Sequence, residues 1–286
     1  MRLASPRFIA CGEPPTASGI VVYGIPFEGR VNLRKGAQAG PRDLRLASDS
    51  IETYSAVLGR DLEDLPLCDL GDCELPADAA PRVQLDAARD EIRRWWHPAL
   101  RPFMLGGDHT ATVPVIEALA PALPGLRVLQ LDAHPDTREE FLGERYNYAS
   151  AMARVMDVVP ADRVYQVGMR TGSREEFERP RPKFFPVMVG HPLDVVRRLL
   201  PELQGCPLYV TIDVDVLDPA HAPGTGSPEP GGLSVPELIE IVRLLGAATV
   251  IGGDLVEVAH AWDPTARTGI AASWVIREAL LTWWGK

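Results

Sequence analysis

Short apolar runs alternate with longer segments of helical periodicity along most of the chain. Short runs of this kind, bounded by polar or turn residues, are typical of buried strands; they cover residues 19–26, 101–107, 126–133, 163–170, 207–214 and 248–258. Apolar residues at helical spacing lie between these runs, at residues 41–58, 84–96, 150–159, 234–246 and 265–284. The helix over 234–246 has a clear start, because Ser234 precedes Pro236 and serine is a preferred helix cap.

The alternation of strand and helix predicts the fold class. Apolar strands that alternate with helices favour an α/β fold of three layers, α/β/α, with a central and mostly parallel sheet. The connections between parallel strands should be right-handed. The 286 residues could form one large core or two small ones. Since no linker, low-complexity segment or internal repeat interrupts the pattern, we expect one domain over residues 1–286.

The charge of the chain narrows the range of partners. Lysine and arginine number 29, aspartate and glutamate 39, and the net charge is −10. A protein this acidic is a poor ligand for nucleic acids or anionic membranes, and a cationic substrate suits it better. No apolar stretch approaches the roughly 20 residues that span a bilayer.

The cysteines and the N-terminal segment predict a compartment. The first residues lack the continuous apolar core of a signal peptide. The cysteines form no CxxC pair and no zinc-ligand spacing, so we interpret them as reduced thiols of a cytoplasmic protein. These thiols are Cys11, Cys68, Cys73 and Cys206, of which we expect Cys68 and Cys206 to be partly buried.

Acidic residues and histidines gather where four of the predicted strands end. In open α/β sheets, ligands bind at the carboxyl ends of the strands. So many carboxylates in one crevice would repel each other and be costly to desolvate, and divalent cations are the simplest compensation. The residues concerned are Asp108, His109, Asp132, His134, Asp136, Asp213, Asp215, Asp218, Asp254 and Glu257.

The residue types at these strand ends indicate the kind of metal. Carboxylates and imidazoles without a thiolate suit a harder divalent ion such as Mn²⁺, with Zn²⁺, Co²⁺ and Fe²⁺ as competitors. Two such ions, about 3.5–4 Å apart and bridged by shared carboxylates and a hydroxide, would form a hydrolytic centre. Each motif alone also fits a capped turn. The occurrence of "GGDHT", "DAHPD" and "DVDVLDP" together, each after an apolar strand, favours the metal site.

With these three motifs, the chain resembles the ureohydrolases, the arginase and agmatinase family. The resemblance covers nearly the whole sequence and is most specific in the three metal motifs. It implies an α/β fold with a central parallel sheet of about eight strands, a dinuclear manganese site and a symmetric homo-oligomer, a trimer or hexamer. The matching segments are "YGIPFEG", "LRKGAQAGPRDLRLASDSIETYS", "DLGD", "GGDHT", "DAHPDTREEFLGERYNYASAMARV", "QVGMRTGSREE", "TIDVDVLDPAHAPGTGSPEPGG" and "GDLVEV".

The resemblance implies a ligand set for two Mn²⁺ ions per chain. The ligands of the first ion would be His109, Asp132, Asp136 and Asp213. The ligands of the second would be His134, Asp132, Asp213 and Asp215, so that Asp132 and Asp213 bridge the two ions.

Further roles follow from the same resemblance. Glu257 matches the acid that grips the guanidinium group, although a structural acid at a strand end is the alternative. A metal-activated hydroxide would attack the guanidinium carbon, and Asp136 would carry a proton to the departing amine. Asp108 and Asp218 would orient ligands or stabilise turns.

The segment after the D-x-H-x-D motif predicts the substrate. Arginases carry a stretch rich in serine, threonine and asparagine there, whereas "TREEFLGERYNY" is charged and longer, as in agmatinases. We therefore expect agmatine, a small cationic guanidino compound, to be hydrolysed to putrescine and urea. The acids that would favour its cationic tail, or form a solvated loop face instead, are Glu139, Glu140 and Glu144. The competing substrates are guanidino acids, arginine and formimidoylglutamate, which need a cation for their carboxylate. Candidates are Arg138, Arg145 and Arg170.

Tyr148 departs from the family pattern, since a histidine is usual at this position. An imidazole with a pKa near 6.5 exchanges protons at neutral pH, whereas a phenol with a pKa near 10 does not. Tyrosine can still donate a hydrogen bond to developing charge. Three interpretations stay open: a slower agmatinase, an enzyme for another guanidino or formimidoyl substrate, or a non-catalytic metal-binding homologue. His221 and His260 would either replace the imidazole or be loop histidines.

Overall fold

The core of the protein is an eight-stranded parallel sheet with the order β4-β1-β5-β10-β9-β6-β7-β8. The computed structural model describes residues 6–12, 19–32 and 34–285. Every pair of neighbouring strands in this sheet is parallel. The predicted α/β/α fold with about eight strands is confirmed. The strands are β1 (Gly19–Ile25), β4 (Leu67–Asp72), β5 (Leu100–Gly106), β6 (Arg127–Leu131), β7 (Val164–Val167), β8 (Lys183–Phe185), β9 (Pro207–Asp213) and β10 (Thr249–Val256).

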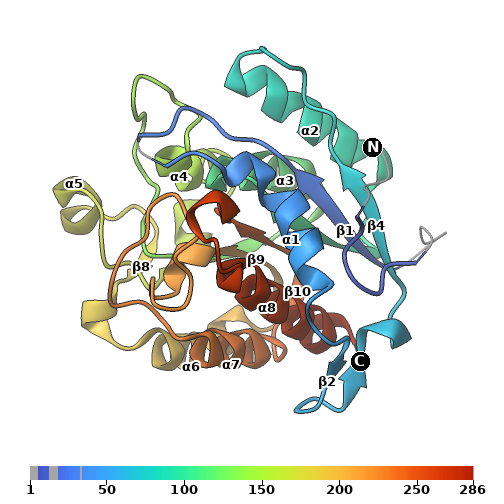
Figure 1. Ribbon diagram of the computed structural model, residues 1–286. Helices are drawn as coiled ribbons and strands as arrows, with labels where there is room; N and C mark the ends of the chain where they lie inside the picture. The colour runs from blue at the N-terminus through green and yellow to red at the C-terminus, as the bar shows by residue number, and fades with distance from the viewer. Residues whose placement is uncertain (1–5, 13–18, 33, 286) are drawn as a thin grey trace.

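Helices cover both faces of the sheet (Figure 1). One face is covered by α1, α6, α7 and α8, and the other by α2, α3 and α4, with a separate buried apolar cluster under each group. Successive residues of a strand point to opposite faces, so Phe103 belongs to the first cluster and Met104 to the second. The helices are α1 (Gly40–Ser48), α2 (Pro81–Trp95), α3 (Thr112–Leu119), α4 (Ala151–Val155), α5 (Arg174–Glu178), α6 (Pro192–Leu203), α7 (Val235–Leu245) and α8 (Arg267–Trp284).

Short 3₁₀ turns complete the connections, and three of them carry residues of the candidate site. Because a 3₁₀ turn tightens the chain directly after a strand, it directs the following side chains back over the strand end. These turns are η1 (Ala37–Ala39), η2 (Leu62–Asp64), η3 (His109–Ala111), η4 (Ala120–Ala122), η5 (Tyr148–Ser150), η6 (Ala161–Arg163), η7 (Val187–Val189), η8 (Val214–Val216) and η9 (His260–Trp262).

All six predicted strands are present, but the helix predicted over 41–58 is wrong in its second half. Helix α1 ends at Ser48, and the chain then forms the small antiparallel pair β2 (Tyr54–Ser55) and β3 (Arg60–Asp61). Gly59, with a φ of 64°, makes the reversal between the two strands. The helix predicted over 150–159 is also shorter, because α4 ends at Val155.

The predicted start of α7 is confirmed in detail. Ser234 accepts a hydrogen bond from the main-chain N–H of Glu237, while the Glu237 carboxylate accepts one from the N–H of Ser234. This reciprocal capping box satisfies two N–H groups that the helix itself leaves unpaired.

The cysteines are free thiols, as predicted. Cys68 and Cys73 are fully buried, whereas Cys11 and Cys206 are partly buried. The expectation that Cys68 is only partly buried is therefore wrong, because β4 is covered by the apolar cluster beneath α2. Among the described residues, no helix is both long and apolar enough to cross a membrane.

A buried ion cluster joins α7 to α8. The Glu278 carboxylate is fully buried and accepts hydrogen bonds from Arg243 Nη2 at 2.8 Å and from Arg277 Nη2 at 2.9 Å. Burial alone would raise the pKa of Glu278, but the hydrogen bonds from Arg243, Ser55 and Arg277 outweigh it and lower the pKa. A lowered pKa stabilises the fold above the unfolded value, about 4.3, and this contribution is lost as the pH falls.

Replacement of Glu278 by alanine should lower the free energy of unfolding by about 3 kcal/mol, because it leaves Arg277 buried without its charge partner. Urea denaturation at neutral pH measures the change. Glu240→Ala is the matched control, since Glu240 is exposed and lies 3.8 Å from Arg197, and it should cost under about 1 kcal/mol. Equal effects of the two variants would contradict the role given to the buried cluster.

Candidate metal centre and active site

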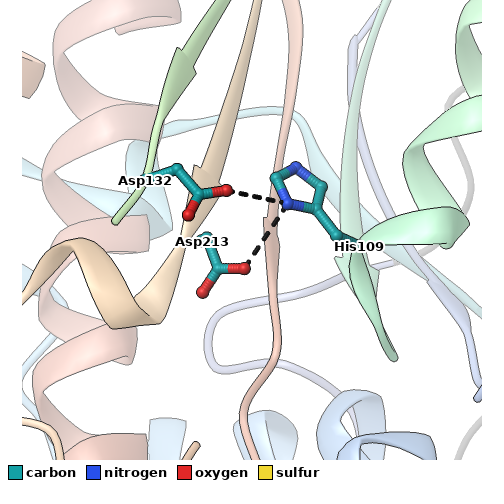
Figure 2. A group of neighbouring side chains, drawn as sticks. All are labelled: His109, Asp132 and Asp213. Atoms are coloured by element: carbon teal, nitrogen blue, oxygen red, sulfur yellow. Dashed lines mark ion pairs between the residues drawn. The ribbon is translucent and has the colours of Figure 1, made fainter. Parts of the chain in front are cut away.

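The candidate site lies at the carboxyl ends of four adjacent strands, β5, β10, β9 and β6. His109 begins η3 after β5, Asp132 follows β6, and Asp213 ends β9. Neighbouring parallel strands end at the same edge of the sheet, so three distant sequence motifs meet there. Figure 2 shows that Asp132 and Asp213 come from strands side by side and face the ring of His109.

The first cluster surrounds one nitrogen of His109. Its Nδ1 lies 3.0 Å from Asp132 Oδ2 and 3.4 Å from Asp213 Oδ2 (Figure 2). The same nitrogen lies 3.0 Å from Asp136 Oδ2. All four side chains are buried. Within the described chain, this Nδ1 has no partner in hydrogen-bonding geometry. A buried imidazole nitrogen that faces three carboxylate oxygens fits a shared cation, and His109, Asp132 and Asp213 are placed to hold one.

The second cluster surrounds His134. Its Nδ1 lies 2.8 Å from Asp215 Oδ2 and 3.6 Å from Asp132 Oδ1. Asp132 therefore offers one oxygen to each cluster, and Asp132, His134 and Asp215 could hold a second ion. Asp213 joins the first cluster through Oδ2, while its Oδ1 accepts the N–H of Asp215 at 2.8 Å. The structure thus brings all six predicted ligands together, and their roles as ligands stay predictions.

The loop after β6 is held in the shape that this convergence needs. Asp136 has a φ of 53°, a left-handed conformation that is uncommon for a residue other than glycine. Its carbonyl accepts the N–H groups of Met152 and Ala153, which stabilises that conformation. Gln130 Nε2 donates to Asp132 Oδ2 at 2.6 Å and to the carbonyl of His134 at 3.1 Å. The loop is therefore tied to both its own strand and α4.

Burial and like charge dominate the electrostatics of the cluster. Burial, together with the charge of Asp132, raises the pKa of Asp136 to about 7. Burial and the charges of Asp215 and Asp132 raise the pKa of Asp213 well above its usual range. Burial would lower the pKa of His109, but the surrounding carboxylates outweigh it and raise that pKa. Protons must compensate the cluster where no cation does, so its donor set and charge fit divalent ions.

Two cavities open beside the cluster, and Tyr148 lines both. The larger, of about 300 Å³, is also lined by Glu257, Arg34 and Glu229. The smaller, of about 200 Å³, is lined by His134, Asp136 and Arg138. Sequence reasoning missed Arg34 and Glu229. Both stand in segments that resemble the family, but no local pattern indicates that they face a cavity.

Glu257 both anchors a loop and faces the larger cavity. Its Oε1 accepts the main-chain N–H of His109 at 2.9 Å, and its own N–H donates to the carbonyl of Gly107. The residue has a φ of 65°, so the chain turns sharply after β10 to present this acid. Burial, with the charges of Asp213 and Asp108, raises the pKa of Glu257 well above its usual range. An acid in this state favours a cationic neighbour.

Tyr148 packs edge-on against Phe141, with ring centroids 5.8 Å apart. Burial, and then the charges of Glu257 and Asp136, raise the pKa of Tyr148 above its ordinary value, so its hydroxyl keeps its proton at neutral pH. His221 and His260 are exposed and line neither cavity. In the part of the chain that the structure describes, neither histidine replaces the imidazole.

The remaining predicted residues have structural contacts. Asp108 accepts N–H groups of Gly29 and Thr110, and Asp218 accepts those of Ala220 and Gly231. Both acids therefore stabilise turns, as expected.

The three candidate arginines differ in their surroundings. Arg170 donates to several main-chain carbonyls, among them that of Asp215, and Arg145 is exposed and pairs with Asp157. Arg138 lines the smaller cavity and pairs with Glu176 at 3.5 Å.

The three acids predicted to favour a cationic tail lie outside both cavities. Glu139 and Glu140 are exposed, and Glu139 pairs with Arg154 and Arg181. Glu144 is partly buried, and its main chain bridges to Phe141. The interpretation as a loop face fits these positions.

Comparison with known proteins places the chain in a family. A model of the arginase family matches residues 18–282, so the chain belongs to the arginase family. The agmatinase of Bacillus anthracis is 38% identical over 268 residues, 93% of this chain and 92% of that protein. The guanidinobutyrase of Pseudomonas aeruginosa is 31% identical, over 90% of this chain and 84% of that protein. The crystal structure of the agmatine ureohydrolase of Thermoplasma volcanium has a TM-score of 0.86 at 28% identity, covering 97% of this chain and 94% of that chain.

These comparisons confirm the resemblance stated from the motifs. The protein is an agmatinase-like ureohydrolase, a hydrolase that acts on amidino C–N bonds.

Binding of Mn²⁺ should release protons and weaken as the pH falls from about 8 to about 6. Asp136, with a pKa of about 7, and the imidazole of His109 hold protons that a cation must displace. Titration calorimetry in two buffers of different ionisation enthalpy measures the protons released at each pH. Binding that is independent of pH and of buffer would contradict the electrostatic description of the cluster.

Proposed function

We propose that this protein is a manganese-dependent agmatinase that hydrolyses agmatine to putrescine and urea. The observation that carries the proposal is the convergence of two imidazoles and four buried carboxylates beside a cavity lined by Glu257. Small guanidino compounds are the substrates that the names of several relatives print, agmatine among them. The acidic net charge of the chain also suits a cationic substrate.

The residues that would hold manganese are the six strand-end ligands. His109 and Asp136 would belong to one ion, His134 and Asp215 to the other, and Asp132 and Asp213 to both. Oxygen-rich sites without thiolates suit Mn²⁺. The chemistry that such a pair supplies when bound is the activation of water for attack at neutral pH.

Glu257 would bind and orient the guanidinium group. It lines the larger cavity, and its carboxylate is raised in pKa by burial and by nearby acids, so a cationic partner there stabilises its ionised form. A guanidinium ion matches a carboxylate in two parallel hydrogen bonds, which fixes the plane of the substrate. Since Glu257 also accepts the N–H of His109, the substrate carbon would be held close to the ligand cluster.

Asp136 would move the proton that the departing amine needs. Its Oδ2 lies 3.0 Å from His109 Nδ1, within the ligand cluster, so its carboxylate would lie close to the water that the metal pair activates. It lines the smaller cavity together with Tyr148. Asp136 would take a proton from the attacking water and deliver it to the amine nitrogen, so that the amine leaves as a neutral molecule.

Tyr148 would stabilise the substrate by donating a hydrogen bond from its hydroxyl. Its position between the two cavities places it beside both Glu257 and Asp136. Because its raised pKa keeps the proton on the hydroxyl, it cannot exchange protons at neutral pH as an imidazole does. We therefore propose a slower agmatinase than one with histidine at this position.

A guanidino acid is the second candidate substrate, and Arg34 favours it. Arg34 lines the larger cavity and has no ion pair with a carboxylate among the described residues. It lies over the ring of Trp262 and donates to the carbonyls of Pro223 and Thr225, at 3.5 Å each. A substrate carboxylate would be a suitable partner, as the likeness to a guanidinobutyrase also suggests.

Three wider predictions stay predictions. They are one domain over residues 1–286, a homo-oligomer of three or six chains, and a cytoplasmic location.

Urea release from Mn²⁺-loaded protein should occur with agmatine and be weaker or absent with arginine, guanidinobutyrate and guanidinopropionate. Formimidoylglutamate is tested by release of formamide. Arg34→Gln should leave turnover of agmatine within about threefold, since agmatine has no carboxylate for it to bind. Hydrolysis of guanidinobutyrate alone, lost in Arg34→Gln, would replace the first proposal by the second.

Two substitutions of Tyr148 distinguish the contribution of its hydroxyl from that of its ring. Tyr148→Phe keeps the packing on Phe141 and should lower kcat by about tenfold, the value of one hydrogen bond to the transition state. Tyr148→His should raise kcat and add a titration near neutral pH to its profile. A kcat that is unchanged in both variants would show that this side chain takes no part in turnover.

A further inference from the structure

A buried hydroxyl lies directly behind the first metal-ligand cluster. Thr211, in β9, places its Oγ1 3.0 Å from Nε2 of His109, on the side of the ring that faces away from the carboxylates. Both side chains are fully buried. Thr211 is therefore the hydrogen-bond partner of the second ring nitrogen of His109.

An unexplained carboxylate lies behind this hydroxyl. Asp254, in β10, is opposite Thr211 in the strand register and is fully buried. Its Oδ2 accepts hydrogen bonds from Thr112 Oγ1 at 2.9 Å and from the Tyr209 hydroxyl at 2.8 Å. Thr211 Oγ1 lies 3.3 Å from Thr112 Oγ1 and so joins the same hydrogen-bonded group. The mechanism proposed above does not use Asp254, although a buried acid needs partners of this kind.

The chemistry of these groups sets the direction of the hydrogen bonds. Thr112 donates its only hydroxyl proton to Asp254 Oδ2, so the hydroxyl of Thr211 is left to donate toward Asp254 or toward Thr112 Oγ1, which lies 3.3 Å away. The oxygen of Thr211 is then free to accept, and the group beside it is Nε2 of His109. The ring must therefore carry its proton on Nε2. The other nitrogen, Nδ1, then has a lone pair directed at Asp132, Asp136 and Asp213.

We propose that Asp254 is a positioning residue that acts through Thr211 to hold His109 in its Nε2–H form, with Nδ1 free to bind a metal ion. The other tautomer, with the proton on Nδ1, would place a ring N–H against the ion and prevent coordination. The inference rests on the proposed metal function. Second partners of this kind commonly change metal affinity by 10–100-fold when they are removed.

Thr211→Val tests the proposal, because valine keeps the shape of threonine and removes the acceptor for Nε2. It should weaken binding of one of two Mn²⁺ ions by about 10–100-fold, measured by titration calorimetry, and leave the other within about threefold. Electron paramagnetic resonance at limiting Mn²⁺ should then show an isolated ion in place of a coupled pair. Thr211→Ser, which restores a hydroxyl, should bind both ions as the wild type does.

Two further variants separate positioning from a loss of stability. Thr282→Val is the matched control, since Thr282 is a buried threonine in α8 whose hydroxyl has no hydrogen-bond partner within the described residues. It should not change metal binding. Asp254→Asn alters the same chain of hydrogen bonds without creating a cavity. If Thr211→Val does not fold, metal binding is measured in Asp254→Asn instead. Because both residues act through His109, the double variant of Thr211 and Asp254 should lose no more metal affinity than the single variant with the larger loss.

The outcomes distinguish this inference from the proposed function. Wild-type protein that binds two ions, with Thr211→Val and Asp254→Asn binding them equally tightly, would overturn the positioning role alone. The same loss in Thr282→Val, or additive losses in the double variant, would also overturn it. Wild-type protein that binds no divalent ion would overturn both proposals.

Discussion

Burial of like charge at one edge of the sheet is the constraint on which the rest of this site depends. Asp132, Asp136, Asp213 and Asp215 are all buried within reach of His109 or His134. Their repulsion and desolvation are tolerable only with compensating cations or protons. The left-handed turn at Asp136 and the amide of Gln130 hold the acids in place at some conformational cost, which is typical of functional sites.

Much of this arrangement could be predicted, because local patterns carry it. Strands buried on both faces are continuous apolar runs, and the acids at their ends interrupt those runs visibly. Parallel topology then brings His109, Asp132 and Asp213 together, although they are far apart in the sequence. The capping box at Ser234 is likewise a local signal.

Other features depend on contacts between distant segments and leave no local signal. The apolar spacing of 41–58 continues past Ser48, but pairing of Tyr54–Ser55 with Arg60–Asp61 overrides it. The short edge strand β8 has too few residues for a periodicity to be visible. Arg34 reaches the cavity only because its segment folds against the loops that follow β9 and β10, where it meets Thr225 and Trp262. Thr211 and Asp254 become partners only through strand register.

The central claim is that the six strand-end residues hold two metal ions. Anomalous diffraction at the manganese edge, from crystals grown with Mn²⁺, tests it most directly. The proposed site predicts two peaks about 3.5–4 Å apart, one beside His109 and one beside His134, with Asp132 between them. A single peak, or none at this edge of the sheet, would contradict the dinuclear centre.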